Sequence, residues 1–133
     1  MRKITRQWLK YAADDLQSAE VLNEREIHTI VCFHCQQCLE KSLKAILQEE
    51  NIKPPRIHNI KVLKDMAENA MDSTLDISLE EANFLSEVYV ESRYPPDIGL
   101  LPHGEPTKED ANKALEIARR VFAQVEKMLE GEV

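Results

Sequence analysis

The chain has 133 residues, enough for one domain with its own core, and its 43% apolar and 31% charged residues are typical of a globular protein. Its formal net charge of −7 excludes nucleic-acid binding through the overall field of the protein, so any contact with RNA or nucleotide needs a local basic site. No apolar run approaches the roughly 18 residues of a membrane span and no signal-peptide core is present, so we expect a cytoplasmic protein without membrane contact.

Helical periodicity in the first half of the chain predicts two long helices, at 4–22 and 26–49. The residues of the first that we expect to face inward are Ile4, Trp8, Tyr11, Ala12, Leu16, Ala19 and Leu22. The apolar stripe of the second consists of Ile27, Ile30, Val31, Leu39, Leu43, Ile46 and Leu47. This helix ends before Pro54 and Pro55, because proline cannot continue a helix.

Three further helices are predicted in the second half of the chain: 58–71, from Ser78 to the Pro95-Pro96 pair, and from Thr107 to Leu129. Ser78 with Glu81 three residues later is a capping-box pattern, which marks the start of a helix. Thr107 is a good N-cap, and the acidic residues that follow it suit the positive end of the helix dipole.

Five amphipathic helices with short links predict an all-α fold, an up-down antiparallel helical bundle that forms a single domain over 1–133. We expect the first, second and fifth helices to form its core. The aromatic residues are expected to pack in that core rather than to stack on bases: Trp8, Tyr11, Phe33, Phe84 and Phe122.

A cluster in the second helix has the residue types of a metal site: Cys32, His34, Cys35 and Cys38. On a helix, however, Cys32 and Cys38 lie about 120° apart around the axis, too spread to share one ion easily. Cysteine also packs as a small buried apolar residue, so we expect a core role and no bound metal. The chain has no glycine-rich phosphate loop either, and no cofactor is expected.

Two charged segments have alternative interpretations. In the second helix, Glu40 and Lys44 form an i, i+4 pair within a polar run, which is typical of a solvated face. From Asp65 to Glu91 there are eight acidic residues and no Lys or Arg, and this stretch is either a solvated face or a docking surface for a basic partner. Three histidines stand alone in the sequence and are expected to be structural or surface residues: His28, His34 and His58.

The candidate site is the proline-interrupted loop after the fourth helix, where Arg93 and Tyr94 precede His103. An arginine can bind a phosphodiester by paired charge-assisted bonds, and a histidine can transfer protons near neutral pH. In the alternative interpretation Arg93 pairs with a neighbouring carboxylate and holds the loop, while His103 is merely exposed. Tyr94 either donates a hydrogen bond to a phosphate or packs.

Four segments in this order resemble the HEPN family (higher eukaryotes and prokaryotes nucleotide-binding domain). They are WLKYAADDL at 8–16, FHCQQCLEKSLKA at 33–45, IHNI at 57–60 followed by Leu63, and SRYP at 92–95. The resemblance covers nearly the whole chain. It implies a helical bundle, similar to nucleotidyltransferase substrate-binding subunits, that forms a homodimer and acts beside a small nucleotidyltransferase in a toxin–antitoxin-like pair.

Many proteins of that family are metal-independent ribonucleases with an arginine followed, after four to six residues, by a histidine. Arg93 matches the arginine, but nine residues and three prolines separate it from His103. We therefore expect binding of nucleotide or RNA, at Arg93 and Tyr94, by a protein that acts with a nucleotidyltransferase. The alternatives are a metal-independent endoribonuclease using Arg93 and His103, and a non-catalytic dimerisation or adaptor bundle with a degenerate site.

Overall fold

The computed structural model describes residues 1–93 and 104–131, and it contains five α-helices within those ranges. These are α1 (Lys3–Glu24), α2 (His28–Glu49), α3 (Ile60–Met71), α4 (Leu79–Arg93) and α5 (Lys108–Leu129). Their bounds lie close to the predicted ones, so the prediction of an all-α helical bundle is confirmed. No helix in this part of the chain is long and apolar enough to cross a membrane.

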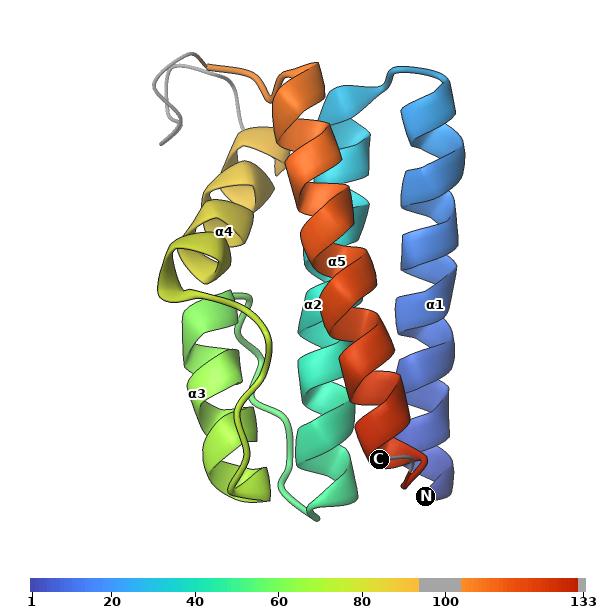
Figure 1. Ribbon diagram of the computed structural model, residues 1–133, viewed down its shortest axis with the longest axis vertical. Coiled ribbons are helices and arrows are strands. Elements are labelled where there is room, and N and C mark those ends of the chain that lie inside the picture. The colour runs from blue at the N-terminus through green and yellow to red at the C-terminus, as the bar shows by residue number, and fades with distance from the viewer. Residues whose placement is uncertain (94–103, 132–133) are drawn as a thin grey trace.

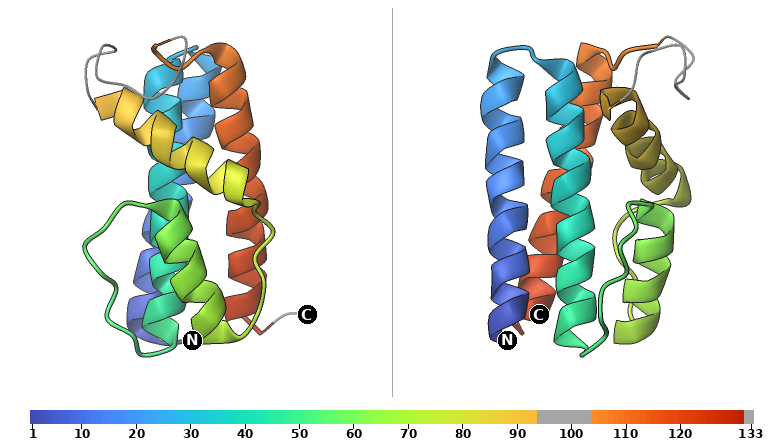
Figure 2. Two further views of the ribbon diagram at one scale, coloured as in Figure 1. Left: turned by 90° about the vertical axis from the view of Figure 1, so that its left-hand side faces the viewer. Right: turned by 180° about the vertical axis from the view of Figure 1, so that it is seen from behind.

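Helix α2 lies at the centre of the bundle and contacts all four other helices. Helices α1 and α5 pack along one flank of α2, and the shorter α3 and α4 follow one another along the other flank (Figure 1). Helix α1 runs antiparallel to α2 and α5. The extended segment after α2 returns along the bundle, so α3 runs in the same direction as α2 (Figure 2). The C-terminal end of α4 and the start of α5 therefore lie at the same end of the bundle.

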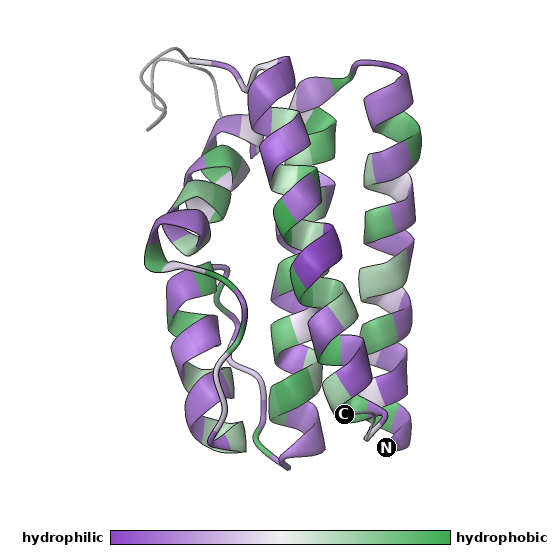
Figure 3. Ribbon diagram, viewed as in Figure 1, coloured by the Kyte–Doolittle hydropathy of each residue, from purple (hydrophilic) through white to green (hydrophobic). Residues whose placement is uncertain are grey.

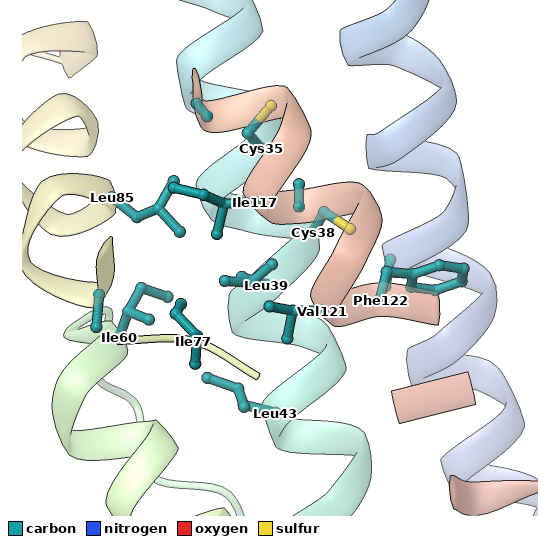
Figure 4. Packing of buried hydrophobic residues seen from close by; sticks show 14 of the residues in the cluster. Cys35, Cys38, Leu39, Leu43, Ile60, Ile77, Leu85, Ile117, Val121 and Phe122 are labelled. Atoms are coloured by element: carbon teal, nitrogen blue, oxygen red, sulfur yellow. The ribbon is translucent and has the colours of Figure 1, made fainter. Parts of the chain in front are cut away.

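The core forms around α2 because its neighbours cover most of its circumference. Figure 4 shows Leu39 and Leu43 of α2 facing apolar residues from three other helices and from the segment before α4: Ile117, Val121, Leu85, Ile60 and Ile77. By contrast, hydrophobic and hydrophilic residues alternate along α1 and α5, as expected of helices with one face against the core (Figure 3). The central helix thus supplies a scaffold that fixes the other four.

The start signals predicted for α4 and α5 are both present. The Ser78 hydroxyl accepts a bond from the backbone N–H of Glu81 at 3.0 Å, and the Glu81 carboxylate accepts one from the backbone N–H of Ser78 at 3.0 Å. Thr107 and Asp110 form the same reciprocal capping box at α5. Each box satisfies backbone donors that the first turn of a helix leaves without partners.

The inward face of α1 differs from the predicted one. Ile4 and Tyr11 are exposed, and the buried positions include the polar residues Thr5 and Asp15. Thr5 is buried because its hydroxyl donates to the Glu49 carboxylate at 2.8 Å, and Asp15 because two α2 side chains pair with it. Because of these contacts, the buried stripe of α1 is displaced by about one residue from the predicted one. Two further apolar residues predicted to face inward are exposed at the start of α2: Ile27 and Ile30.

The three cysteines of α2 are fully buried, which confirms their expected place in the core. Figure 4 shows Cys35 and Cys38 pointing into the packed interior. Burial raises the pKa of the Cys32 and Cys38 thiols to about 12, and it raises that of Cys35 further still. At pH 8 the thiols are therefore both covered and protonated, and neither condition favours reaction with an electrophile.

We accordingly expect a thiol reagent at pH 8 to label the native protein far more slowly than the unfolded protein, in which all three cysteines react. Spectrophotometric labelling with and without denaturant measures both rates. Labelling of the native chain as fast as of the unfolded chain would show that the α2 core is open.

We expect Leu43→Ala to destabilise the fold by about 2–5 kcal/mol, because it leaves a cavity around the central helix. Leu79→Ala is the matched control: it removes the same atoms from a side chain that is 53% exposed, and should change stability by less than about 0.5 kcal/mol. Urea unfolding of both variants gives the two free energies. Equal losses would contradict the central position of α2.

Candidate functional site

Arg93 is the last residue of α4, and its guanidinium is held against Tyr89 one turn earlier. A guanidinium N–H donates to the Tyr89 hydroxyl, and the guanidinium carbon lies 5.3 Å from the centre of the Tyr89 ring. Arg93 is exposed whereas Tyr89 is buried, so a rigid residue of the helix positions a cation at the surface. Arg93 is thus an exposed residue at the end of α4 whose guanidinium lies against a buried ring.

Tyr89 joins Arg93 to two other rings. The His58 imidazole lies 5.2 Å from the Tyr89 ring centre to centre, and the Phe33 ring stacks on Tyr89 at 6.1 Å. A pocket of about 210 Å³ opens here, lined by His58, Asn59, Ser86, Tyr89 and Val90. Arg93 and His58 thus contact the same tyrosine, and the pocket lies beside it.

The buried carboxylate of Glu40 holds the imidazole of His58. The imidazole Nδ1 lies 2.8 Å from Glu40 Oε1, which also accepts a bond from the Gln36 amide at 3.2 Å. Lys44 Nζ lies 3.0 Å from Glu40 Oε2. The Gln36 amide also donates to the backbone carbonyl of His58 at 2.9 Å, which fixes the segment that carries the histidine.

The prediction that Glu40 and Lys44 belong to a solvated face is wrong, because each residue is only 6% exposed. The i, i+4 spacing is correct, but His58 in the segment before α3 contacts Glu40, and Trp8 of α1 lies beside Lys44. A buried carboxylate and a buried ammonium are tolerated together because each neutralises the other and both are hydrogen-bonded. The pair is therefore part of the interior and also the support of His58.

The bond to Glu40 determines which nitrogen of His58 is available for chemistry. A carboxylate can only accept, so the proton of neutral His58 resides on Nδ1. The lone pair is then on Nε2, and no residue in the described ranges bonds that atom. Because the His58 side chain is 54% exposed, Nε2 can accept a proton from a bound molecule.

Another histidine, His34 in α2, is also held by a carboxylate. His34 Nδ1 lies 2.8 Å from Asp15 Oδ1, and Lys41 Nζ lies 2.6 Å from Asp15 Oδ2. A larger pocket, of about 500 Å³, lies beside His34 between α1 and α2. His34 does not contact Tyr89, because Phe33 lies between them. The cation beside His34 is Lys41, which shares the Asp15 carboxylate with it, whereas the cation beside His58 is Arg93, which shares Tyr89 with it.

The structure places one of the three residues predicted for the site. Arg93 is the last residue of α4 and not part of the loop after it, where it was expected, whereas Tyr94 and His103 lie outside the described residues. His58, which the sequence suggested was structural or a surface residue, joins the site through Tyr89 and Glu40. Since Glu40 and His58 are 18 residues apart and in different segments, no local motif connects them. Within the described ranges, no group of three or more metal-ligating side chains could hold a metal ion.

Comparison with known proteins agrees with this architecture. The HEPN domain model matches residues 5–128. The chain is 30% identical over 136 aligned positions to the Methanocaldococcus jannaschii protein named "Putative toxin MJ1304", an alignment covering 96% of this chain and 89% of that relative.

Two crystal structures have a similar fold. TT1696 from Thermus thermophilus has a TM-score of 0.73 at 26% identity, covering 95% of this chain and 98% of that one. ST0689, described as an archaeal HEPN homologue, has a TM-score of 0.62 at 24% identity, covering 96% and 98%. With the family model matching nearly the whole length of the bundle, this chain belongs to the HEPN family.

Proposed function

We propose that this protein is the toxin-like member of a toxin–antitoxin-like pair, that it binds RNA or a nucleotide at Arg93, and that it acts with a nucleotidyltransferase. Membership of the HEPN family and the similarity to a relative named as a toxin support the first part. One observation carries the binding part: the guanidinium of Arg93 is exposed and held against Tyr89, beside a pocket.

An arginine in this position suits a phosphate ligand. Its planar guanidinium presents paired N–H donors that match two phosphate oxygens, and its charge is permanent. The chain as a whole carries a net charge of −7, so attraction to a nucleic acid has to come from a local basic site, and Arg93 is the cation that we propose for it. We infer that few phosphates are contacted, which makes the affinity only weakly dependent on salt.

The partner proposal involves the acidic segment 65–91. Part of its charge is already neutralised inside the protein, since Arg120 pairs with Glu81 at 2.7 Å and Lys64 with Glu68 at 2.9 Å. Asp72 and Glu80 are exposed and lie on either side of the α3–α4 link. They are the residues of the segment best placed to meet a basic surface on a nucleotidyltransferase.

We further propose that the protein is a cytoplasmic homodimer, a proposal that rests on the family alone. Two alternatives start from the same site. One is a metal-independent endoribonuclease using Arg93 and His103, and the other is a non-catalytic dimerisation or adaptor bundle. Ligand binding that depends on Arg93 would exclude the adaptor, and measurement of RNA cleavage separates the other two.

For Arg93→Ala we expect affinity for a fluorescent single-stranded RNA to fall roughly 10- to 100-fold, the loss of one charge-assisted bond worth about 1.5–3 kcal/mol. Arg6→Ala is the matched control: it removes an exposed arginine near the start of α1, at the opposite end of the bundle, and should bind as wild type. Anisotropy titrations at modest salt measure all three proteins. Equal affinities for both variants would contradict the proposed binding site.

We expect the double variant Asp72→Lys/Glu80→Lys to retain much less of a nucleotidyltransferase encoded nearby in a pull-down at modest salt, because the reversed charges repel a basic surface. Glu24→Lys reverses an exposed charge at the end of α1 and serves as the control. Capture of the enzyme by neither wild type nor control would contradict the partner proposal, and equal capture by all three would contradict the docking surface.

A further inference from the structure

We propose that His58 is a catalytic residue of the Arg93 site: its Nε2 accepts the proton of a ribose 2′-hydroxyl while Arg93 binds the neighbouring phosphate. Glu40 is the positioning residue that holds the imidazole. The proposal rests on the proposed binding of RNA at Arg93 and adds the residue that would make this site cleave RNA. It assigns to His58 the proton transfer for which the sequence offered only His103.

The pair of Glu40 and His58 has the geometry of an oriented base. The 2.8 Å bond to Nδ1 fixes the ring and its tautomer, and it stabilises the positive charge that appears when Nε2 takes a proton. Glu40 cannot turn away, because Gln36 and Lys44 bind its two oxygens. The carboxylate is buried and the imidazole is half exposed, so the support is rigid and the reactive atom faces outward.

His58 and Arg93 both lie beside the Tyr89 ring. The His58 imidazole centre is 5.2 Å and the Arg93 guanidinium carbon 5.3 Å from the same Tyr89 ring centre. The distance between the imidazole and the guanidinium therefore cannot exceed the sum of these two distances. The hydroxyl of Tyr89 is bonded to Arg93, which fixes the guanidinium relative to the ring. The pocket of about 210 Å³ borders both His58 and Tyr89 and gives a ribose a place to enter.

The chemistry that this pair supports requires no redox partner. His58 Nε2 removes the 2′-hydroxyl proton, the 2′ oxygen forms a bond to phosphorus, and the bond from phosphorus to the 5′ oxygen breaks. The leaving 5′ oxygen takes a proton from water, and the imidazolium returns its proton to solvent. The products are a 2′,3′-cyclic phosphate and a 5′-hydroxyl. Arg93 stabilises the additional negative charge on the phosphate oxygens in the transition state.

His34 provides an internal comparison. It has the same 2.8 Å bond from Nδ1 to a carboxylate, but Phe33 separates it from Tyr89 and Arg93. A histidine with a carboxylate partner is therefore not enough to mark the reactive centre. What distinguishes His58 is that it shares Tyr89 with the cation.

The test measures both binding and cleavage of labelled RNA, with a chelator present, by wild type, His58→Ala, Glu40→Gln and the control His34→Ala. We expect His58→Ala to cleave about 100-fold or more slowly while binding RNA within threefold of wild type, as for the loss of a proton acceptor. Added imidazole should restore part of its cleavage. Glu40→Gln should be impaired and His34→Ala should cleave within about twofold of wild type, and thermal unfolding verifies that each variant is folded.

Cleavage by His58→Ala at the wild-type rate would overturn the proposal, as would loss of cleavage that imidazole does not restore, since that indicates a structural role. Wild type that binds RNA through Arg93 without cleaving it overturns the role of His58 and leaves the proposed function standing. Wild type that binds no RNA contradicts the proposed function itself. A cyclic phosphate end on the product, with no cleavage of a 2′-deoxy substrate, supports the proposal.

Discussion

The candidate site depends on one buried carboxylate, that of Glu40 in the central helix. An ionised carboxylate in the interior costs several kcal/mol unless it is paired and hydrogen-bonded. Glu40 meets this requirement through Lys44, Gln36 and His58, which belong to α2 itself and to the segment before α3. Lys44 also lies 6.0 Å from the Trp8 ring centre on α1. Glu40 thus links α2, α1 and the segment before α3. That last segment carries His58, whose imidazole is half exposed.

The bundle then brings α4 to this network. Tyr89 stacks on Phe33 of α2, contacts His58 and bonds Arg93 at the surface, so one buried tyrosine of α4 links the cation to the Glu40 network. Arg93 and Tyr89 are on a helix, and His58 is on a segment that Gln36 and Glu40 of α2 hold in place. Such preorganised groups lose less entropy on binding. The phosphate site that we propose at Arg93 is local, so it does not require an overall positive field.

Periodicity and capping signals were sufficient to predict the helices, because Ser78 and Thr107 act through bonds to residues three positions away. They were insufficient wherever a buried polar residue depends on a distant partner. Asp15 faces inward because Lys41 and His34 of another helix meet it, and hydropathy alone would place it outside. Glu40 was misinterpreted for the same reason. Sequence therefore predicted the helical framework, whereas the role of Arg93 stays a prediction, and sequence could not predict which polar residues the packing encloses.

The long separation between Arg93 and His103 along the chain does not prevent another histidine from lying near Arg93 in the fold. A short spacing between an arginine and a histidine brings them together only if both lie in one helical segment, and Pro95 and Pro96 prevent that here. Tertiary packing provides another route, because α3 and α4 both lie along α2 and place His58 beside Tyr89. Proton transfer requires a histidine near the phosphate in space, at any distance along the chain. The long separation between Arg93 and His103 along the chain is therefore compatible with the role that we propose for His58.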